Sequence, residues 1–62
     1  MTKFFERTEE ERTLVRLAYD FEIMAIEQED NSRNPYFDSI KALHDGEELW
    51  EAIYIAVELR YH

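Results

Sequence analysis

The sequence predicts a small all-α fold: a three-helix bundle of one long, one short and one long helix, completed by homodimerisation. Apolar residues recur at the three- and four-residue intervals of amphipathic helices. Two of these stretches are preceded by the residue spacing of a helix N-terminal cap. The 62-residue chain contains one glycine and one proline, which favours a few helices over many short strands. A hydrophobic content of 45% and an aromatic content of 15% predict that the chain folds, and its length predicts a single domain over residues 1–62.

The first helix is expected over residues 9–29, after an N-terminal arm of residues 1–7 whose two phenylalanines, Phe4 and Phe5, pack onto the bundle. Thr8 and Glu11 have the spacing of a capping box. The apolar residues that follow form two stripes, so this helix is expected to touch two neighbours. The first stripe is Leu14, Leu17, Ala18, Phe21, Met24 and Ala25, and the second is Val15, Tyr19, Ile23 and Ile26.

A second, short helix is expected over residues 35–44. Pro35 suits the first position of a helix, and Asn34 before it is the expected cap. Gly46 lies just beyond the last apolar residue, where glycine commonly stops a helix.

The third helix is expected over residues 46–61, because Asp45 and Glu48 repeat the capping spacing. Residues 52–57, with the sequence AIYIAV, are rich in residues that favour strands, so a strand is the alternative there. Wound as a helix, the apolar residues cover an arc of about 220°, whereas an ordinary surface helix needs just over 100°.

This wide arc has two explanations. Either the third helix is central and the other two cover it, or part of the arc is a homodimer seam. Tyrosine and tryptophan side chains in it are either core residues with a polar tip at the surface or interface anchors. The residues expected in self-association or in an apolar interface are Trp50, Tyr54, Ile55, Tyr61, Tyr19 and Ile23.

The net charge of −8 argues against direct binding of nucleic acid or of an anionic membrane, and it favours a protein partner with a basic surface. The longest apolar run, residues 52–57, is too short to cross a bilayer. Cysteine is absent, which suits a reducing compartment. We therefore expect a soluble, cytoplasmic protein.

Residues 20–30 and 45–58 contain no lysine or arginine. Within them, carboxylates recur seven residues apart, on one side of a helix and about 10 Å from one another. Such rows could occupy a basic groove meant for a nucleic-acid backbone; the alternative is that they are solvated faces that keep the protein soluble. The carboxylates expected to bind a partner are Asp20, Glu22, Glu27, Glu29, Glu48, Glu51 and Glu58.

The segment ELWEAIYIAVE, residues 48–58, resembles a helix of the phage antirestriction DNA mimics in its pattern of acidic residues, leucine, alanine and isoleucine. That family is all-helical, dimeric and acidic, and it blocks restriction enzymes by presenting carboxylates in place of phosphates. The resemblance implies this role for Glu48, Glu51 and Glu58.

The sequence contains no glycine-rich phosphate loop and no recognisable nucleophile arrangement, so neither an enzyme nor a cofactor is expected. Glu58 and His62 have the spacing of two metal ligands, but no second cluster supports them and no metal site is expected. The function expected is inhibition of a basic, nucleic-acid-binding protein. The alternative is an adaptor whose binding surface is apolar, centred on Trp50, Tyr54 and Tyr61.

Overall fold

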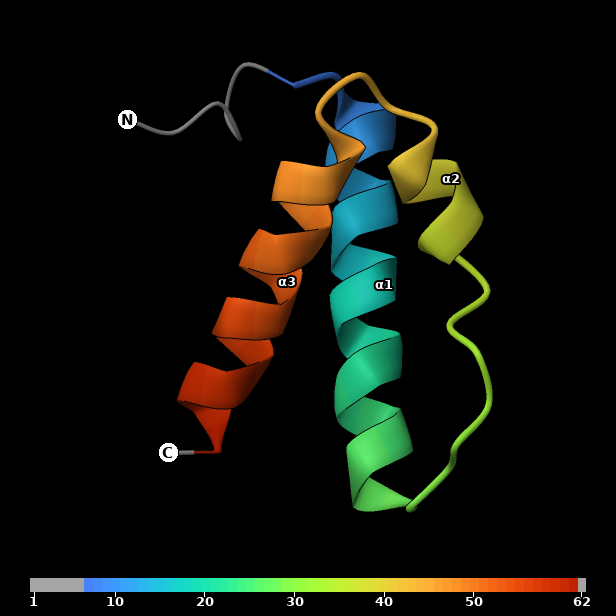
Figure 1. Cartoon of the computed structure of the whole chain (residues 1–62), viewed down its shortest axis with the longest axis vertical. Helices are drawn as coiled ribbons and strands as arrows, with labels where there is room; N and C mark the ends of the chain where they lie inside the picture. The colour runs from blue at the N-terminus through green and yellow to red at the C-terminus, as the bar shows by residue number, and fades with distance from the viewer. Residues whose placement is uncertain (1–6, 62) are drawn as a thin grey trace.

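A computed structural model describes residues 7–61 and contains three helices: α1 (Glu9–Glu27), α2 (Phe37–Lys41) and α3 (Gly46–Arg60). α1 and α3 lie side by side and run in the same direction, while the connection after α1 returns along it to α2 (Figure 1). Each helix contacts the other two. The described residues contain no strand, so the all-α prediction of three helices is confirmed and the strand alternative for residues 52–57 is wrong.

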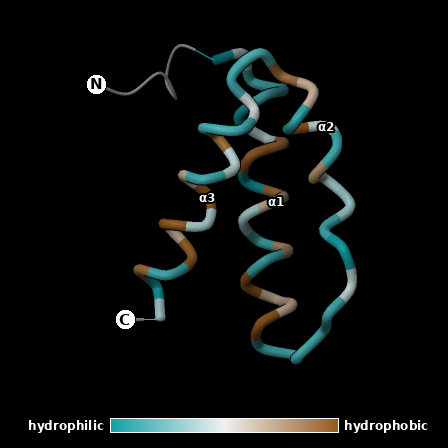
Figure 2. The backbone as a smooth tube through the Cα atoms, viewed as in Figure 1, coloured by the Kyte–Doolittle hydropathy of each residue, from teal (hydrophilic) through white to brown (hydrophobic). Residues whose placement is uncertain are grey.

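The core lies between the three helices. Its six buried apolar residues come from all of them: Ala18, Ile23, Ile40, Trp50, Ile53 and Val57. On α3 the buried side chains recur at intervals of three and four residues, which places them on one face. Apolar segments recur along both long helices in Figure 2, and on α3 the exposed Ile55 and Leu59 lie outside this face. None of the helices in the described part of the chain is long and apolar enough to span a membrane. The arm residues Phe4 and Phe5 lie outside the described residues.

The start of α1 confirms the predicted cap. The Thr8 hydroxyl accepts a hydrogen bond from the backbone N–H of Glu11 at 3.1 Å, and three glutamates occupy the first turn. Carboxylates are stabilised there by the positive end of the helix dipole. The Glu11 carboxylate lies within 3.5 Å of the Arg7 guanidinium, which connects the start of α1 to the residue before the cap.

α1 ends at Glu27, two residues before the predicted end. The Asp30 N–H donates to the Ala25 carbonyl at 2.8 Å, and the Glu29 N–H donates to the Ile26 carbonyl at 3.2 Å. These two bonds form a Schellman motif, in which the residue after the cap turns left-handed. Glu29 takes that position with φ of 53°. Because the residue there is glutamate rather than glycine, the sequence carries no obvious signal for this end.

α2 is shorter than the predicted helix over residues 35–44, and it begins after Tyr36. The expected cap, Asn34, instead forms a turn: its side-chain oxygen accepts from the Tyr36 N–H at 2.9 Å. Its amide nitrogen donates to the Ala18 carbonyl at 3.1 Å and to the Glu22 carboxylate at 2.9 Å. Asn34 is buried, and it ties the segment before α2 to α1.

Gly46 does not stop α2 in a left-handed conformation; it is the first residue of α3, with a negative φ. A Cβ atom added at Gly46 would lie 2.2 Å from the Ile40 carbonyl oxygen and 2.7 Å from Cα of Lys41. The glycine is therefore required by the close approach of two backbones. This contact holds the start of α3 against the end of α2.

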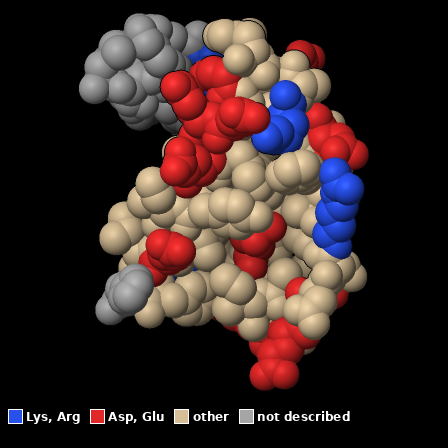
Figure 3. Space-filling model, in the orientation of Figure 1, with Lys and Arg blue, Asp and Glu red and all other residues tan. Residues whose placement is uncertain are grey.

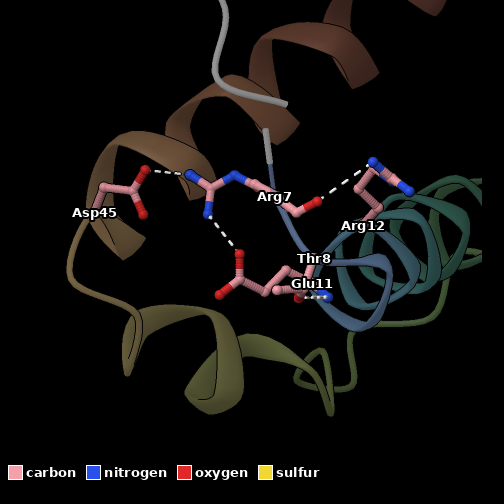
Figure 4. A network of polar contacts seen from close by, with 5 residues as sticks. All are labelled: Arg7, Thr8, Glu11, Arg12 and Asp45. Carbon is pink, nitrogen blue, oxygen red and sulfur yellow. Dashed lines mark hydrogen bonds and ion pairs between the residues drawn. The ribbon is translucent and has the colours of Figure 1, made fainter. Parts of the chain in front are cut away.

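Asp45, the expected cap of α3, makes no side-chain capping hydrogen bond. Its carboxylate pairs with the guanidinium of Arg7, which also reaches Glu11, so Arg7 joins the starts of α1 and α3 (Figure 4). The Arg7 side chain is 9% exposed, and its hydrogen bond holds the pKa of the Asp45 carboxyl below its usual range.

Candidate protein-binding surfaces

Glu51 and Glu58, the predicted row on α3, are both exposed. They lie about 160° and 140° around the helix from the buried Ile53, so they point away from the core. No ion pair or hydrogen bond joins either side chain to another described residue. Glu48 is also exposed, one turn before Glu51. The three carboxylates singled out by the resemblance are thus accessible and without a cationic neighbour in the described chain.

Asp20 and Glu27, the predicted row on α1, are exposed and lie roughly opposite the fully buried Ala18 at about 100° per residue. Asp20 faces Arg16 at 4.0 Å in an exposed pair of the kind that contributes little stability. Glu27 accepts a hydrogen bond from the Tyr61 hydroxyl at 3.5 Å. These contacts are long, so both carboxylates stay available to a partner.

The predicted row formed by Glu22 and Glu29 is wrong. Glu22 is half-buried and binds the amide of Asn34, whereas Glu29 lies beyond the end of α1 in the left-handed turn. A row requires both carboxylates on one helical surface, and the helix ends between them.

Two exposed basic residues near α2 do not neutralise the acidic rows, because they pair with other carboxylates. Arg33 pairs with Asp38 at 2.6 Å, and Lys41 lies 3.5 Å from Glu47. In Figure 3 the acidic side chains gather over the start of α3, and the basic ones lie towards α2. This segregation leaves the first turns of α3 negative, in agreement with the absence of lysine and arginine from residues 45–58.

The structure separates the residues predicted for an apolar interface. Trp50 and Ile23 belong to the core, where Trp50 is 6% exposed, so neither provides an exposed surface for self-association. Tyr19 is half-buried, packs against the core, and raises the pKa of Arg60 through its hydroxyl. Exposed side chains remain at Tyr54, Ile55 and Tyr61.

An apolar surface covers the side of the α1–α3 pair that faces away from α2. On α1, Leu17 and Met24 lie about 140–160° around the helix from Glu22, which contacts the segment before α2. On α3, the residues that face away from α2 lie about 120–180° around the helix from Trp50, which contacts Phe37 of α2. They are Ala52, Ile55, Ala56 and Leu59. We call this surface the bare face; its residues are Leu17 and Met24 of α1 and Ala52, Ile55, Ala56 and Leu59 of α3.

Most of the bare face is open to solvent. Leu59 is 70% exposed and Ile55 is 53% exposed, and both alanines are exposed. Intervals of three and four residues from Ala52 to Leu59 give α3 a second packing stripe, with small residues that allow another helix to approach closely. The excess apolar arc of the sequence is therefore explained: α1 and α2 cover one part of it and leave this part uncovered.

On the side of α2, an open cleft of about 470 Å³ was not anticipated from the sequence. Its lining residues are Glu22, Ser32, Arg33, Asn34, Phe37, Trp50 and Tyr54. The spacing of Trp50 and Tyr54 on one helix could have indicated an aromatic pair, but Phe37 and Glu22 reach the cleft from other elements. Their meeting depends on the contacts of Asn34 with Ala18 and Glu22 of α1, which no local sequence pattern specifies.

Within residues 7–61, no group of three side chains is placed to hold a metal ion, and His62 lies outside that range. No family model, curated protein or solved structure matches this chain. The function must therefore be inferred from the surfaces of the molecule itself.

Proposed function

We propose that this protein binds the basic surface of a nucleic-acid-binding protein in the cytoplasm and inhibits it by mimicking the charge of DNA. The observation that carries the proposal is the row of Glu51 and Glu58, exposed on the side of α3 opposite its core and unpaired within the described chain. Glu48, and Asp20 with Glu27 on α1, add further exposed carboxylates. A helix holds the backbones of such residues about 10 Å apart before binding, so only their side chains have to be ordered in the complex.

Charge neutralisation tests this function. A variant that neutralises both rows is expected to bind its partners at least tenfold more weakly at low salt and with a flatter salt dependence, because fewer ion pairs form in the complex. The proteins that a heparin column retains from a cell lysate are offered to the immobilised protein, and the amount captured is measured. The measurement is repeated at rising salt concentrations and with a competing DNA duplex. The changes are Asp20→Asn, Glu27→Gln, Glu51→Gln and Glu58→Gln.

The matched control makes the same four chemical changes, and so the same change in net charge, at exposed positions outside the two rows. It should keep capture within about twofold, since all four carboxylates of the rows stay charged. Equal losses of captured protein in both variants would show that only the net charge matters. Captured proteins that the competing DNA duplex does not displace would contradict mimicry of DNA. The control changes are Glu9→Gln, Glu10→Gln, Glu29→Gln and Asp30→Asn.

The same proposal includes a homodimer, formed by the bare faces of two copies. The two faces together would bury on the order of 1,000 Å², at the low end for a specific interface, so we expect micromolar affinity. A second copy fits because the α3 part of the face is an apolar stripe with the spacing of helix packing. It would also cover apolar surface that a chain of 62 residues cannot cover by itself.

Sedimentation equilibrium over a range of protein concentrations tests the dimer. The double variant Ile55→Glu with Leu59→Glu is expected to stay monomeric where the parent protein associates, because it would bury charges in the seam. The control, Ser39→Glu with Ala42→Glu, adds the same charge at exposed positions near α2 and should associate like the parent.

A parent protein that is monomeric at every concentration would contradict the dimer. The bare face would then suit the alternative function, an adaptor that holds its partner through apolar contacts. In that case capture should resist high salt and should be lost in the Ile55→Glu, Leu59→Glu variant, because burial of apolar surface does not depend on charge screening.

A further inference from the structure

The cleft beside α2 is built from three aromatic side chains and a carboxylate. The ring centroids of Phe37 and Trp50 lie 5.1 Å apart with an interplanar angle of 83°, and those of Trp50 and Tyr54 lie 5.3 Å apart at 70°. Each neighbouring pair of rings is thus close to perpendicular. Glu22 contributes its carboxylate from α1. Aromatic walls of this kind attract cations because the faces of the rings carry negative charge.

The carboxylate in the cleft is only partly used. One oxygen of Glu22, Oε2, accepts a hydrogen bond from Asn34, and that bond fixes the position of the side chain. The other oxygen has no partner among the described residues. A fixed carboxylate beside aromatic rings offers a cation both an ion pair and a stacking surface.

Cations of the chain itself already use one of these rings. The guanidinium carbon of Arg33 lies 4.9 Å from the centroid of Phe37, and the Lys41 ammonium nitrogen lies 5.7 Å from it. The side chain of Arg33 is 68% exposed and also pairs with Asp38. Arg33 therefore lies at the open edge of the cleft, while Tyr54 and the free oxygen of Glu22 remain available.

The geometry points to this cleft as a binding site for an arginine side chain of a protein partner. A guanidinium is planar, so it stacks on an aromatic ring while its N–H groups donate to a carboxylate. The source of the arginine rests on the proposed function, since a partner with a basic surface supplies such side chains. The cleft would add recognition of one side chain to the longer-range attraction of the acidic rows.

The test uses small probes and the full chain without a partner. N-acetyl-arginine methylamide is titrated while NMR follows the indole N–H signal of Trp50, the single tryptophan. The matched probe is the citrulline analogue, which has nearly the same shape but no charge. We expect a saturable shift in the millimolar range with the arginine probe, at least tenfold weaker binding of citrulline, and weaker binding of the lysine analogue.

Variants locate the site. Tyr54→Leu and Glu22→Gln are each expected to weaken binding of the arginine probe by about threefold to tenfold. Tyr61→Leu and Glu51→Gln change an exposed tyrosine and an exposed glutamate outside the cleft, and each should stay within twofold. Arg33→Ala should strengthen binding by about twofold or more, because it removes a competing cation from Phe37, whereas Arg16→Ala should not.

Equal binding of the arginine and citrulline probes would overturn the inference, and so would equal losses in Glu22→Gln and Glu51→Gln. Circular dichroism is used to check that each variant is folded; Tyr54 is 46% exposed, so we expect the Tyr54→Leu variant to fold. These results are independent of the capture experiment. If the arginine probe does not bind, the capture experiment still tests the acidic rows. If neutralising the rows does not weaken capture, the titration still shows whether the cleft binds a guanidinium group.

Discussion

Replacing Gly46 with alanine is expected to lower the free energy of unfolding by about 3 kcal/mol, the upper end of the typical 1–3 kcal/mol cost of overpacking, because the atoms that the new Cβ meets belong to the backbone of Ile40 and Lys41 and cannot rotate away. The new Cβ would lie 2.2 Å from the Ile40 carbonyl oxygen, so α2 and α3 must move apart. For a domain of this size each kcal/mol lowers the melting temperature by about 4–8 °C. Thermal and urea unfolding followed by circular dichroism measure the loss.

Helix propensity and tertiary packing predict opposite changes in the free energy of unfolding for Gly46→Ala, so the measurement distinguishes them. Alanine favours a helix over glycine by about 1 kcal/mol, so a reading of α3 by itself predicts that Gly46→Ala stabilises the protein. The control Glu47→Ala changes the next, exposed position and should alter stability by less than about 0.5 kcal/mol. Unchanged or increased stability of Gly46→Ala would show that the two backbones are not in contact.

The substitution Asn34→Asp is expected to cost about 2–4 kcal/mol at neutral pH, because it removes buried donors and places a second charge beside Glu22. The amide of Asn34 donates to the Ala18 carbonyl and to the Glu22 carboxylate, while its oxygen accepts from Tyr36. Aspartate keeps the acceptor and loses both donor contacts. Three acceptors would then face one another in a buried position.

The loss should depend on pH. Repulsion from Glu22 raises the pKa of the carboxyl that Asn34→Asp introduces, so the folded variant binds more protons than its unfolded chain just above the ordinary carboxyl range. Stability of the variant should therefore fall as pH rises through that interval, and it should recover on acidification. Urea unfolding at a series of pH values measures this slope against the parent protein.

Two further variants isolate the cause. Asn31→Asp makes the same change at an exposed position in the same loop and should cost little. Adding Glu22→Gln to Asn34→Asp restores a donor opposite the new carboxylate and should recover much of the loss. A loss that is independent of pH and is not recovered in the double variant would contradict the proposed repulsion.

The fold was largely predictable because its signals are local. The cap at Thr8 and the helical spacing of apolar residues depend on neighbours within one turn, so they can be recognised in the sequence. The end of α1 was misplaced because its left-handed residue is Glu29, where glycine would have been the recognisable signal. α2 was predicted too long because Asn34 binds α1 instead of capping the next helix.

The candidate surfaces were predictable to different degrees. Glu51 and Glu58 could be placed together because seven residues make two helical turns, whereas Glu22 and Glu29 failed because the helix stops between them. Trp50 and Leu59 share one apolar arc, yet the first is buried and the second is 70% exposed. Helical periodicity shows which residues share one side of a helix, but it does not show which side a neighbouring helix covers.

The sequence by itself determined the helices, the excess of negative charge and the presence of more apolar surface on α3 than one face requires, because these follow from spacing and composition. The tertiary structure alone decided what each surface adjoins. It brought Gly46 against the backbone of α2, assigned Trp50 to the core, left the bare face open and assembled the cleft from Glu22, Phe37 and Tyr54. Contacts between residues distant in the chain depend on how the helices pack, and no local pattern encodes that packing.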